Sequence, residues 1–249
     1  MSLCGWELRV YSFGRAGGGR VAGKPQTPAE LRGGAAAGDV DERSFLRVGH
    51  MKKLGILLSG RGSNFEAIAR NVQAGKIPAE IAVVISNKPE AFGLARAKEM
   101  GLAARSIPSK GKEREAFDRE VVAVLREFEV DLVCLAGFMR ILSPYFVREF
   151  PRRILNIHPA LLPSFPGEDA QRQALEHGVK FTGCTVHVVD EGTDTGPIVC
   201  QAVVPIEDSD TVETLADRIL REEHHIYSEA ICLLLEDKVR FEGRRVLRK

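Results

Sequence analysis

The chain has 249 residues, of which 44% are hydrophobic and 28% are charged, and its formal net charge is +1. This is the composition of a globular α/β protein, and a charge so close to zero provides no general attraction to nucleic acid or to a membrane surface. No apolar run reaches the roughly 18 residues that a membrane-spanning helix needs, so none is expected.

The first fifty residues differ in composition from the rest of the chain. Residues 1–50 hold 10 of the 24 glycines and show no sustained strand or helix periodicity. Such a stretch buries too little apolar surface to offset its ordering entropy. At Met51 the sequence changes to "MKKLGILLSG". We therefore expect one folded domain over 51–249, with 1–50 either a disordered extension or an upstream, mis-assigned start.

Short apolar runs alternate with amphipathic runs after Met51. Strands are predicted over 54–59, 80–86, 103–107 and 131–137, and helices over 64–74, 92–100 and 114–128. The strand runs are continuously apolar, which is typical of strands covered on both faces. This alternation predicts a Rossmann-like α/β fold, a mostly parallel twisted sheet with helices on both faces.

The later part of the chain has a different pattern. Two β-rich runs, "CTVHVVD" and "PIVCQAVVPI", flank the turn-rich segment "EGTDTG" and predict adjacent or hairpin strands, antiparallel, at the late edge of the sheet. A long helix is predicted over 212–235, and "VRFEGRRVLR" predicts a short hairpin. The five cysteines form no C-x-x-C pair, which favours reduced thiols in a cytoplasmic protein.

The turn "SGRGSN" at 59–64 is a candidate phosphate site. It supplies the first two glycines of the dinucleotide-binding motif G-x-G-x-x-G, but Phe65 stands at the position of the third glycine. A dinucleotide site also needs an acidic residue after the second strand to bind the ribose, and this chain has "SNK" there. Both features argue against a dinucleotide site. The lysine of a triphosphate-binding loop is also missing. A helix that begins near Ser63 and Asn64 suits a single phosphate group. The alternative is a capping box between Ser63 and Glu66 with no ligand.

A second group of polar residues lies in "NIHP". Asn156 and His158 are two residues apart, so on a strand their side chains share one face, and Pro159 ends the strand. Open α/β sheets bind ligands at such strand ends. The alternative is a hydrogen-bonded histidine at the end of a strand.

The acidic turn "VDEGTDTGP" and the segment "EEHHIY" complete the candidate polar sites. The turn carries three carboxylates without the spacing of an EF-hand, so calcium is not favoured. The adjacent histidines of "EEHHIY" point in different directions on a helix. We expect no metal site.

Six segments together resemble the glycinamide ribonucleotide formyltransferases, the folate-dependent enzymes of purine synthesis. They are "SGRGSN" (59–64), "SNK" (86–88), "AGFMRILSP" (136–144), "NIHPALLPSFPG" (156–167), "DEGTDTGP" (190–197) and "EHHIY" (223–227). The resemblance covers 51 to about 240. "NIHP" with "D-x-G-P" points to formyltetrahydrofolate-using transferases in general, and "GRGSN" with "EHHIY" points to this family.

The resemblance implies a specific reaction and specific partners. The formyl group of 10-formyltetrahydrofolate, a cosubstrate, would pass to the amine of glycinamide ribonucleotide, giving N-formylglycinamide ribonucleotide and tetrahydrofolate on the route to IMP. No metal, nucleic acid or membrane is implied. The protein would be a cytoplasmic monomer or weak homodimer.

The resemblance also implies roles for individual residues. The catalytic residues would be Asn156, His158 and Asp194. The substrate phosphate would be held by Gly62, Ser63 and Asn64, and the glycinamide end by Glu223. Folate would be bound by Arg114, Met139, Arg140, Ile141, Leu142, Asn156, Asp190, Glu191, Gly192, Thr193 and Asp194. Glu168 departs from the family pattern, which usually has an apolar residue there.

These residues fit the chemistry of formyl transfer. Attack of an amine on the formyl carbon creates an oxyanion, for which Asn156 and His158 can supply N–H donors. His158 titrates near neutral pH and can accept or return a proton. Asp194 is expected to raise the pKa of His158, to orient its ring or to hold a water. A loop over 162–172 is expected to close over the site.

Three alternatives remain open at this point. A formyltetrahydrofolate hydrolase would use the same trio with water as acceptor, but would carry an N-terminal regulatory domain longer than 1–50. A methionyl-tRNA formyltransferase would carry a further C-terminal domain, and near-neutral charge fits tRNA poorly. A non-catalytic nucleotide-binding module would leave the trio without a role.

Overall fold

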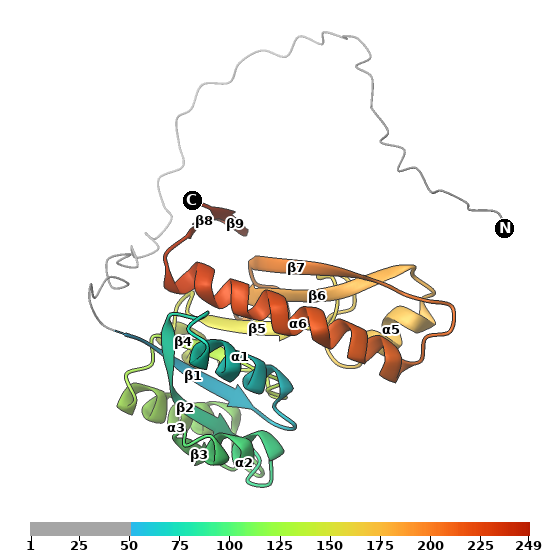
Figure 1. Ribbon diagram of the computed structural model, residues 1–249. Helices are drawn as coiled ribbons and strands as arrows, with labels where there is room; N and C mark the ends of the chain where they lie inside the picture. Colours follow the sequence, from blue (N-terminus) through green and yellow to red (C-terminus); the bar gives the residue numbers. More distant parts are fainter. Residues whose placement is uncertain (1–50) are drawn as a thin grey trace, which may run out of the picture. The chain divides into compact units, whose positions relative to one another are not determined.

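The computed structural model describes residues 51–249, and the prediction for 1–50 lies outside the described residues. In the described part, nine strands form one sheet in the order β3-β2-β1-β4-β5-β6-β7-β9-β8 (Figure 1). The strands are β1 (Lys52–Leu58), β2 (Ala79–Ser86), β3 (Ala104–Ser106), β4 (Leu132–Leu135), β5 (Ile154–His158), β6 (Phe181–Val188), β7 (Ile198–Pro205), β8 (Val239–Glu242) and β9 (Arg245–Arg248). The helices are α1 (Ser63–Gln73), α2 (Phe92–Glu99), α3 (Arg114–Glu127), α4 (Pro144–Glu149), α5 (Ala170–Glu176) and α6 (Val212–Leu235).

The sheet has a parallel part and an antiparallel part. Strands β1 to β5 pair in parallel, whereas β6 pairs antiparallel with both β5 and β7. The predicted α/β fold with late antiparallel strands is therefore confirmed. The hairpin at the C-terminal end is also confirmed, because β8 and β9 pair antiparallel and β9 extends the sheet beside β7.

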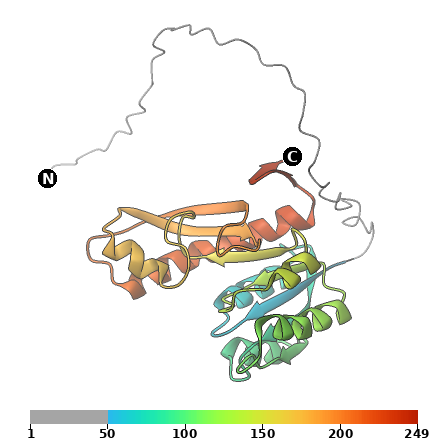
Figure 2. The same cartoon turned by 180° about the vertical axis from the view of Figure 1, so that it is seen from behind.

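Helices cover both faces of the sheet, as Figures 1 and 2 show from opposite sides. Apolar side chains of α1, α2 and α6 form one core with the first face, and those of α3 and α4 form a second core with the other. Strand β1 is buried along most of its length, while β7 alternates between buried and exposed residues. The continuous apolar runs of the sequence thus correspond to the strands between the two helical layers.

Two short helices were not predicted from the sequence. Helix α4 has 6 residues and α5 has 7, too few turns for an apolar period to be recognised. For α4 a local signal exists, since Ser143 accepts a hydrogen bond from Phe146 N and Pro144 occupies the first turn. Both helices lie in segments that lead into or out of the cavity described below.

Helix α1 begins without a side-chain cap. Its N-cap is Gly62, at φ +82°, and no side chain caps it. A Cβ atom on Gly62 would lie 2.8 Å from Gly93 Cα, so both the left-handed conformation and the close approach of α2 require glycine. The capping box between Ser63 and Glu66 is therefore not formed, because Ser63 is already the first helical residue.

The long helix α6 is anchored to the sheet by a buried tyrosine. The Tyr227 hydroxyl lies 3.0 Å from the carbonyl oxygens of Leu135, the last residue of β4, and Leu155, the second residue of β5. Glu223 lies one turn earlier on the same face of α6 and is also buried. The anchor therefore fixes the position at which α6 presents Glu223.

Two further features bear on the sequence predictions. No helix in 51–249 is long and apolar enough to cross a membrane. The four described cysteines, Cys134, Cys184, Cys200 and Cys232, are free thiols. Burial raises the pKa of Cys184 to about 12 and that of Cys200 to about 11, so both are protonated at neutral pH.

Candidate active site

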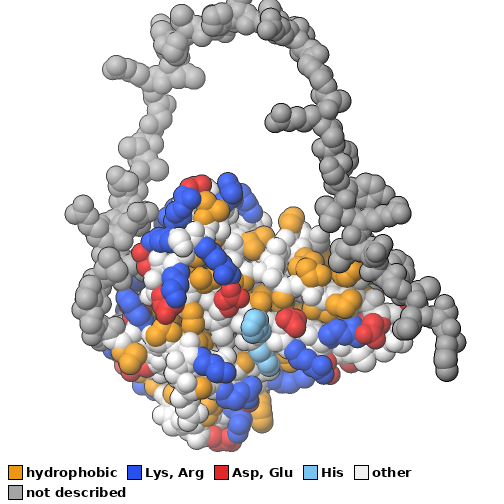
Figure 3. Space-filling view, turned by 45° about the horizontal axis from the view of Figure 1, so that its top comes forward, with side chains coloured by type: hydrophobic (Ala, Val, Ile, Leu, Met, Phe, Trp, Pro, Cys, Tyr) orange, Lys and Arg blue, Asp and Glu red, His pale blue; other side chains and the backbone are white. Residues whose placement is uncertain are grey.

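A cavity of about 500 Å³ opens at the carboxyl ends of β4 and β5, where parallel sheets bind ligands. The predicted site residues that line it are Asn64, Met139, Arg140, Ile141, Leu142, Asn156, His158, Asp190, Gly192, Thr193, Asp194 and Glu223. Figure 3 shows one face of the molecule, over which basic and acidic side chains are interspersed rather than gathered by sign.

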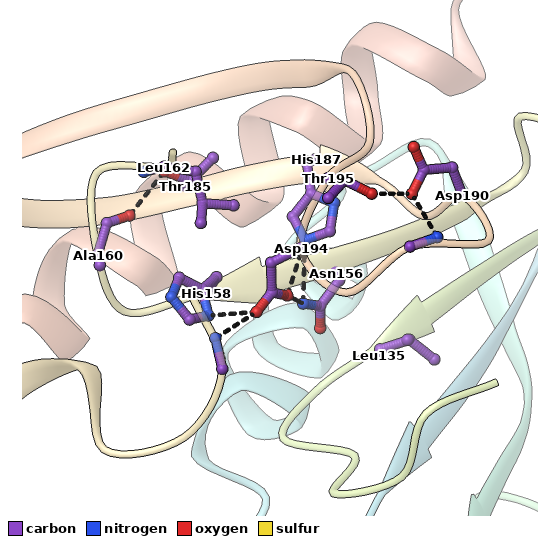
Figure 4. Close-up of polar contacts among 12 residues, drawn as sticks. Leu135, Asn156, His158, Ala160, Leu162, Thr185, His187, Asp190, Asp194 and Thr195 are labelled. Carbon is purple, nitrogen blue, oxygen red and sulfur yellow. Dashed lines mark hydrogen bonds and ion pairs between the residues drawn. The ribbon is translucent and has the colours of Figure 1, made fainter. Parts of the chain in front are cut away.

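The predicted catalytic trio converges on one carboxylate (Figure 4). His158 Nδ1 lies 3.4 Å from Asp194 Oδ2, and Asn156 Nδ2 lies 3.5 Å from Asp194 Oδ1. Asn156 and His158 come from one face of β5, as their spacing predicts, whereas Asp194 comes from the loop between β6 and β7. The fold thus brings together residues that are 38 positions apart.

The loop that carries Asp194 is held by hydrogen bonds of its own. Asp194 has φ +54°. Asp190 Oδ1 accepts bonds from Gly192 N (3.1 Å) and from the Thr195 hydroxyl (2.7 Å). These contacts form a tight turn, which aims the Asp194 side chain toward β5.

Asp194 is ionised at neutral pH. Burial alone would raise its pKa, but the neighbouring His187, the hydrogen bond from Gly167 N and the neighbouring His158 together bring the pKa below the ordinary value. The Gly167 N–H donates to Asp194 Oδ2 at 2.9 Å. The carboxylate is therefore available as a negative centre beside both β5 side chains.

Asp194 does act to raise the pKa of His158, as expected, but the pKa still lies below its ordinary value. Burial is the largest influence on His158 and lowers its pKa below the ordinary value. Asp194 and the Phe165 carbonyl act in the opposite direction but do not outweigh burial. At neutral pH the imidazole is therefore uncharged, and it can accept a proton.

The hydrogen bonds around His158 fix which ring nitrogen carries the proton. Both groups beside the ring only accept, and the Phe165 carbonyl oxygen, 2.8 Å from Nε2, is closer than Asp194 Oδ2, 3.4 Å from Nδ1, so the neutral ring is assigned its proton on Nε2. His158 Nδ1 is then unprotonated and faces Asp194. In this conformation His158 Nε2–H donates to the Phe165 carbonyl oxygen. Phe165 lies in the loop over 162–172 that is expected to close over the site.

A fourth side chain, His187, belongs to this group and was missed in the sequence. It is opposite Asn156 in the antiparallel pairing of β5 and β6, and its Nε2 lies 3.1 Å from Asn156 Nδ2. Its Nδ1 lies 3.1 Å from the Val188 carbonyl, so Nε2 accepts the Asn156 hydrogen bond. A polar residue inside the apolar run "CTVHVVD" was the available signal.

The other end of the cavity contains a buried amide and a buried acid. Asn64 Nδ2 donates to Glu223 Oε2 at 2.7 Å, while Asn64 Oδ1 is buried without a hydrogen-bond partner. Burial raises the pKa of Glu223, and the Asn64 bond only partly offsets this. An unpaired buried acceptor is costly, so a ligand N–H or O–H at Asn64 Oδ1 would be stabilising.

Four predicted residues do not line the cavity: Gly62, Ser63, Arg114 and Glu191. Gly62 and Ser63 form the uncapped start of α1 beside Asn64, where free backbone N–H groups suit an anion. Arg114 is exposed at the first position of α3, and Glu191 pairs with Arg148 at 3.7 Å. Glu168, the departure from the family pattern, is exposed and lines the cavity.

Within residues 51–249, no three His, Cys, Asp or Glu side chains are grouped so that they could hold a metal ion. The two histidines of "EEHHIY" do point apart, since His224 is half-buried and His225 is exposed. The absence of a metal cofactor stays a prediction.

The comparisons with known proteins agree with one another. A model of the formyl transferase family matches residues 52–231. The phosphoribosylglycinamide formyltransferase of Escherichia coli (strain K12) is 42% identical over 186 residues, which cover 74% of this chain and 88% of that protein. Glycinamide ribonucleotide transformylase 1 from Symbiobacterium toebii is 52% identical, with a TM-score of 0.79 over 81% of this chain and 95% of that structure.

A longer relative also matches. The trifunctional purine biosynthetic protein adenosine-3 of Drosophila melanogaster is 48% identical over 187 residues, which cover 74% of this chain but only 14% of that relative. The present chain thus corresponds to a small part of such multifunctional proteins and to most of the bacterial ones.

Proposed function

The chain belongs to the formyl transferase family, and from this premise we propose that it transfers the formyl group of 10-formyltetrahydrofolate to the amine of glycinamide ribonucleotide. The products are N-formylglycinamide ribonucleotide and tetrahydrofolate. The observation that carries the proposal is the convergence of Asn156, His158 and Asp194 in a cavity that also contains Asn64 and Glu223.

The two ends of the cavity suit the two substrates. The start of α1 offers backbone N–H groups to the 5′-phosphate, and Asn64 Oδ1 offers an unpaired acceptor to an N–H or O–H group of the ribonucleotide. Glu223 lies beside it to receive the glycinamide end. The folate binds between the loop from Met139 to Leu142 and the loop from Asp190 to Asp194.

The reaction begins with attack of the substrate amine on the formyl carbon. A tetrahedral oxyanion forms, and Asn156 stabilises it by donating an amide hydrogen. The Asn156 bond to Asp194 is long, at 3.5 Å, so little is lost when that hydrogen is redirected to the oxyanion. His187 keeps the amide oriented through the other hydrogen.

Proton transfer then uses the pair formed by His158 and Asp194. The amine loses a proton as the new C–N bond forms, and His158 Nδ1, which lies 3.4 Å from Asp194 Oδ2, accepts it. The imidazolium that results is stabilised by the adjacent carboxylate. The proton is returned to the folate nitrogen as the C–N bond of the donor breaks, which regenerates the neutral imidazole.

A movement of the loop at 162–172 completes the site. For His158 Nε2–H to donate to the oxyanion, the Phe165 carbonyl that now accepts it at 2.8 Å must move away. Phe165 and Asp169 both have φ +54°, a conformation that side-chain-bearing residues rarely adopt. Closure over bound substrates excludes the water that would hydrolyse the formyl donor.

The test is formyl transfer from 10-formyltetrahydrofolate to glycinamide ribonucleotide by the full chain. We expect Asn156→Ala and His158→Ala each to lower kcat by about 10²- to 10³-fold, as loss of one oxyanion donor does. His225→Ala, on the exposed side of α6, is the matched control and should leave kcat unchanged. Full activity in the Asn156 and His158 variants would contradict the proposed mechanism.

The same assay separates the hydrolase alternative. Formation of tetrahydrofolate in the absence of glycinamide ribonucleotide, at the rate seen in its presence, would identify water as the acceptor. We expect tetrahydrofolate to form only when the ribonucleotide is present, with one formyl group transferred for each donor consumed.

A further inference from the structure

Ser59 connects the two loops that the substrates are proposed to occupy. It follows β1 directly and precedes the glycine turn, and its side chain is buried. Its hydroxyl donates to Asn87 Oδ1 at 2.6 Å and accepts from Met139 N at 2.8 Å. Its backbone N–H donates to the Gly137 carbonyl at 3.0 Å. Ser59 therefore contacts the loop after β4 at two points.

Asn87 fixes the direction of these hydrogen bonds. Its Oδ1 can only accept, so the Ser59 hydroxyl hydrogen is committed to it and a Ser59 lone pair remains for the Met139 N–H. Asn87 is held in turn by Ser109, because Asn87 Nδ2 donates to Ser109 Oγ at 3.2 Å and Ser109 N donates to the Asn87 carbonyl at 3.3 Å. All three side chains are buried. This chain of bonds will be called the Ser59–Asn87–Ser109 network.

Apolar packing and a main-chain hydrogen bond hold the loop after β4. Phe138 and Leu142 are buried in the second core, whereas the Met139 and Ile141 side chains between them are 62% and 53% exposed. Arg140 lies over the Phe117 ring, with its guanidinium carbon 4.7 Å from the ring centroid. The bond from Met139 N to Ser59 thus holds the backbone of the exposed stretch between the two packed residues.

We propose that Ser59, oriented by Asn87, is a positioning residue for the folate side of the site. The network sets the position of the backbone from Met139 to Leu142, beside which the folate is proposed to bind, and its loss should weaken folate binding. It also gives a role to the "SNK" segment after β2, which the proposed function leaves without one. The inference rests on the proposed function, because it takes folate to be the occupant beside this loop.

The test compares the Michaelis constants of the two substrates. Ser59→Ala leaves the buried Met139 N–H and Asn87 Oδ1 without their partner, and we expect the KM for 10-formyltetrahydrofolate to rise about tenfold. The KM for glycinamide ribonucleotide and kcat should change by less than about twofold, because the start of α1 is still held by the bond from Gly93 N to the Gly60 carbonyl. Ser59→Thr keeps the hydroxyl and should restore most of the folate affinity.

Asn87→Ala provides a second, independent variant. It removes the group that orients the Ser59 hydroxyl, so its effect on the folate KM should be smaller than that of Ser59→Ala. In the double variant the two effects should not add, because both act through the same hydrogen bond to Met139 N. Additive effects on the folate KM would contradict the network.

Ser228→Ala is the matched control. Ser228 accepts a hydrogen bond from Asn71 Nδ2 at 2.8 Å between α1 and α6, outside the cavity. Both serine variants lose a partly or fully buried hydroxyl, so both should lower the thermal midpoint. Only Ser59→Ala should weaken the binding of tetrahydrofolate, measured directly by calorimetry.

The outcomes distinguish this inference from the proposed function. Wild-type chain that neither transfers the formyl group nor binds tetrahydrofolate would overturn the proposed function. Active wild-type chain with an unchanged folate KM in Ser59→Ala would overturn only the positioning role. Equal increases of both Michaelis constants in Ser59→Ala would also overturn it, because that is the result of a general loss of structure.

Discussion

At the scale of single residues, the site depends on how burial and charge set the protonation of a few groups. His158 is neutral because burial lowers its pKa more than Asp194 raises it, and Asp194 is ionised because its hydrogen bonds outweigh its burial. When a neutral base beside a carboxylate accepts a proton, the carboxylate stabilises the charged form that results. Removing the carboxylate should therefore change how His158 titrates.

Asp194→Asn should lower the pKa of His158 further. The carboxylate is one of the groups that raise this pKa, so its removal leaves burial and His187 acting in the same, lowering direction. In the proposed mechanism His158 acts in its neutral form, so activity should fall as the pH drops through its pKa. The acidic limb of the kcat profile should therefore move to lower pH, on top of an overall loss of rate.

Profiles of kcat against pH for both forms, with an NMR titration of the His158 ring, provide the measurement. Asp208→Asn, at an exposed aspartate outside the cavity, is the control and should leave the profile where it is. An acidic limb that stays in place or moves to higher pH in Asp194→Asn would show that the carboxylate does not support the charged imidazole.

At the scale of elements, each functional group depends on how its helix or loop is tied to the sheet. Helix α6 is tied through Tyr227, and the loop from Met139 to Leu142 is tied at one end through Ser59. Its other end leads to Ser143, whose N–H donates to Asp118 Oδ2 of α3 at 2.6 Å. These ties are buried polar contacts, which are costly to leave half-made.

Tyr227→Phe should destabilise the protein by about 1 to 3 kcal/mol, because two buried carbonyl groups lose their nearby donor. Urea unfolding is the measurement. Tyr145→Phe on α4 is the control, since that ring lies beneath Arg119 and phenylalanine keeps the contact, so a change within about 0.5 kcal/mol is expected. Equal stabilities of wild type and Tyr227→Phe would show that the hydroxyl does not anchor α6.

Asp118→Asn should retain or raise the stability at pH 7, whereas Asp118→Ala should lower it. Burial raises the pKa of Asp118 despite its bonds to Ser143, so the folded state binds the proton more tightly than the unfolded state. The free energy of unfolding that depends on Asp118 therefore falls as the pH rises from the pKa of the unfolded state through the raised pKa of the folded state. Asparagine keeps an acceptor for Ser143 N and carries no charge.

Urea unfolding of the three forms between pH 4 and pH 8 tests this. The stability of Asp118→Asn relative to wild type should increase as the pH rises. A variant that is less stable than wild type at every pH would show that the ionised carboxylate is required to hold Ser143.

At the scale of the whole molecule, the cavity is assembled from segments across the chain. The start of α1, the loop after β4, strand β5, the β6–β7 loop and α6 all contribute to its lining. The parallel half of the sheet supplies the start of α1 and the loop after β4, and the antiparallel part supplies His187 and the β6–β7 loop. Ligands that contact so many segments should stabilise the fold as a unit.

Glycinamide ribonucleotide at about 100 times its Kd should stabilise the folded chain by about 2.7 kcal/mol. For a domain of this size, that raises the Tm by about 5 to 10 °C. Differential scanning calorimetry provides the measurement, with adenosine monophosphate at the same concentration as a control for the phosphate alone. The absence of a larger shift with the ribonucleotide than with the control would contradict the assignment of this substrate.

The sequence by itself determined the order of the main elements and the parallel sheet, and its resemblance to a known family predicted the trio Asn156, His158 and Asp194. The elements follow from apolar periodicity and the resemblance from short motifs, which are local properties of the chain. Only the tertiary structure decided that His187 joins the trio, that His158 is neutral, and that Ser59 ties two loops together. The reason is physical: partners across paired strands, and the balance of burial against charge, depend on contacts between residues far apart in the sequence.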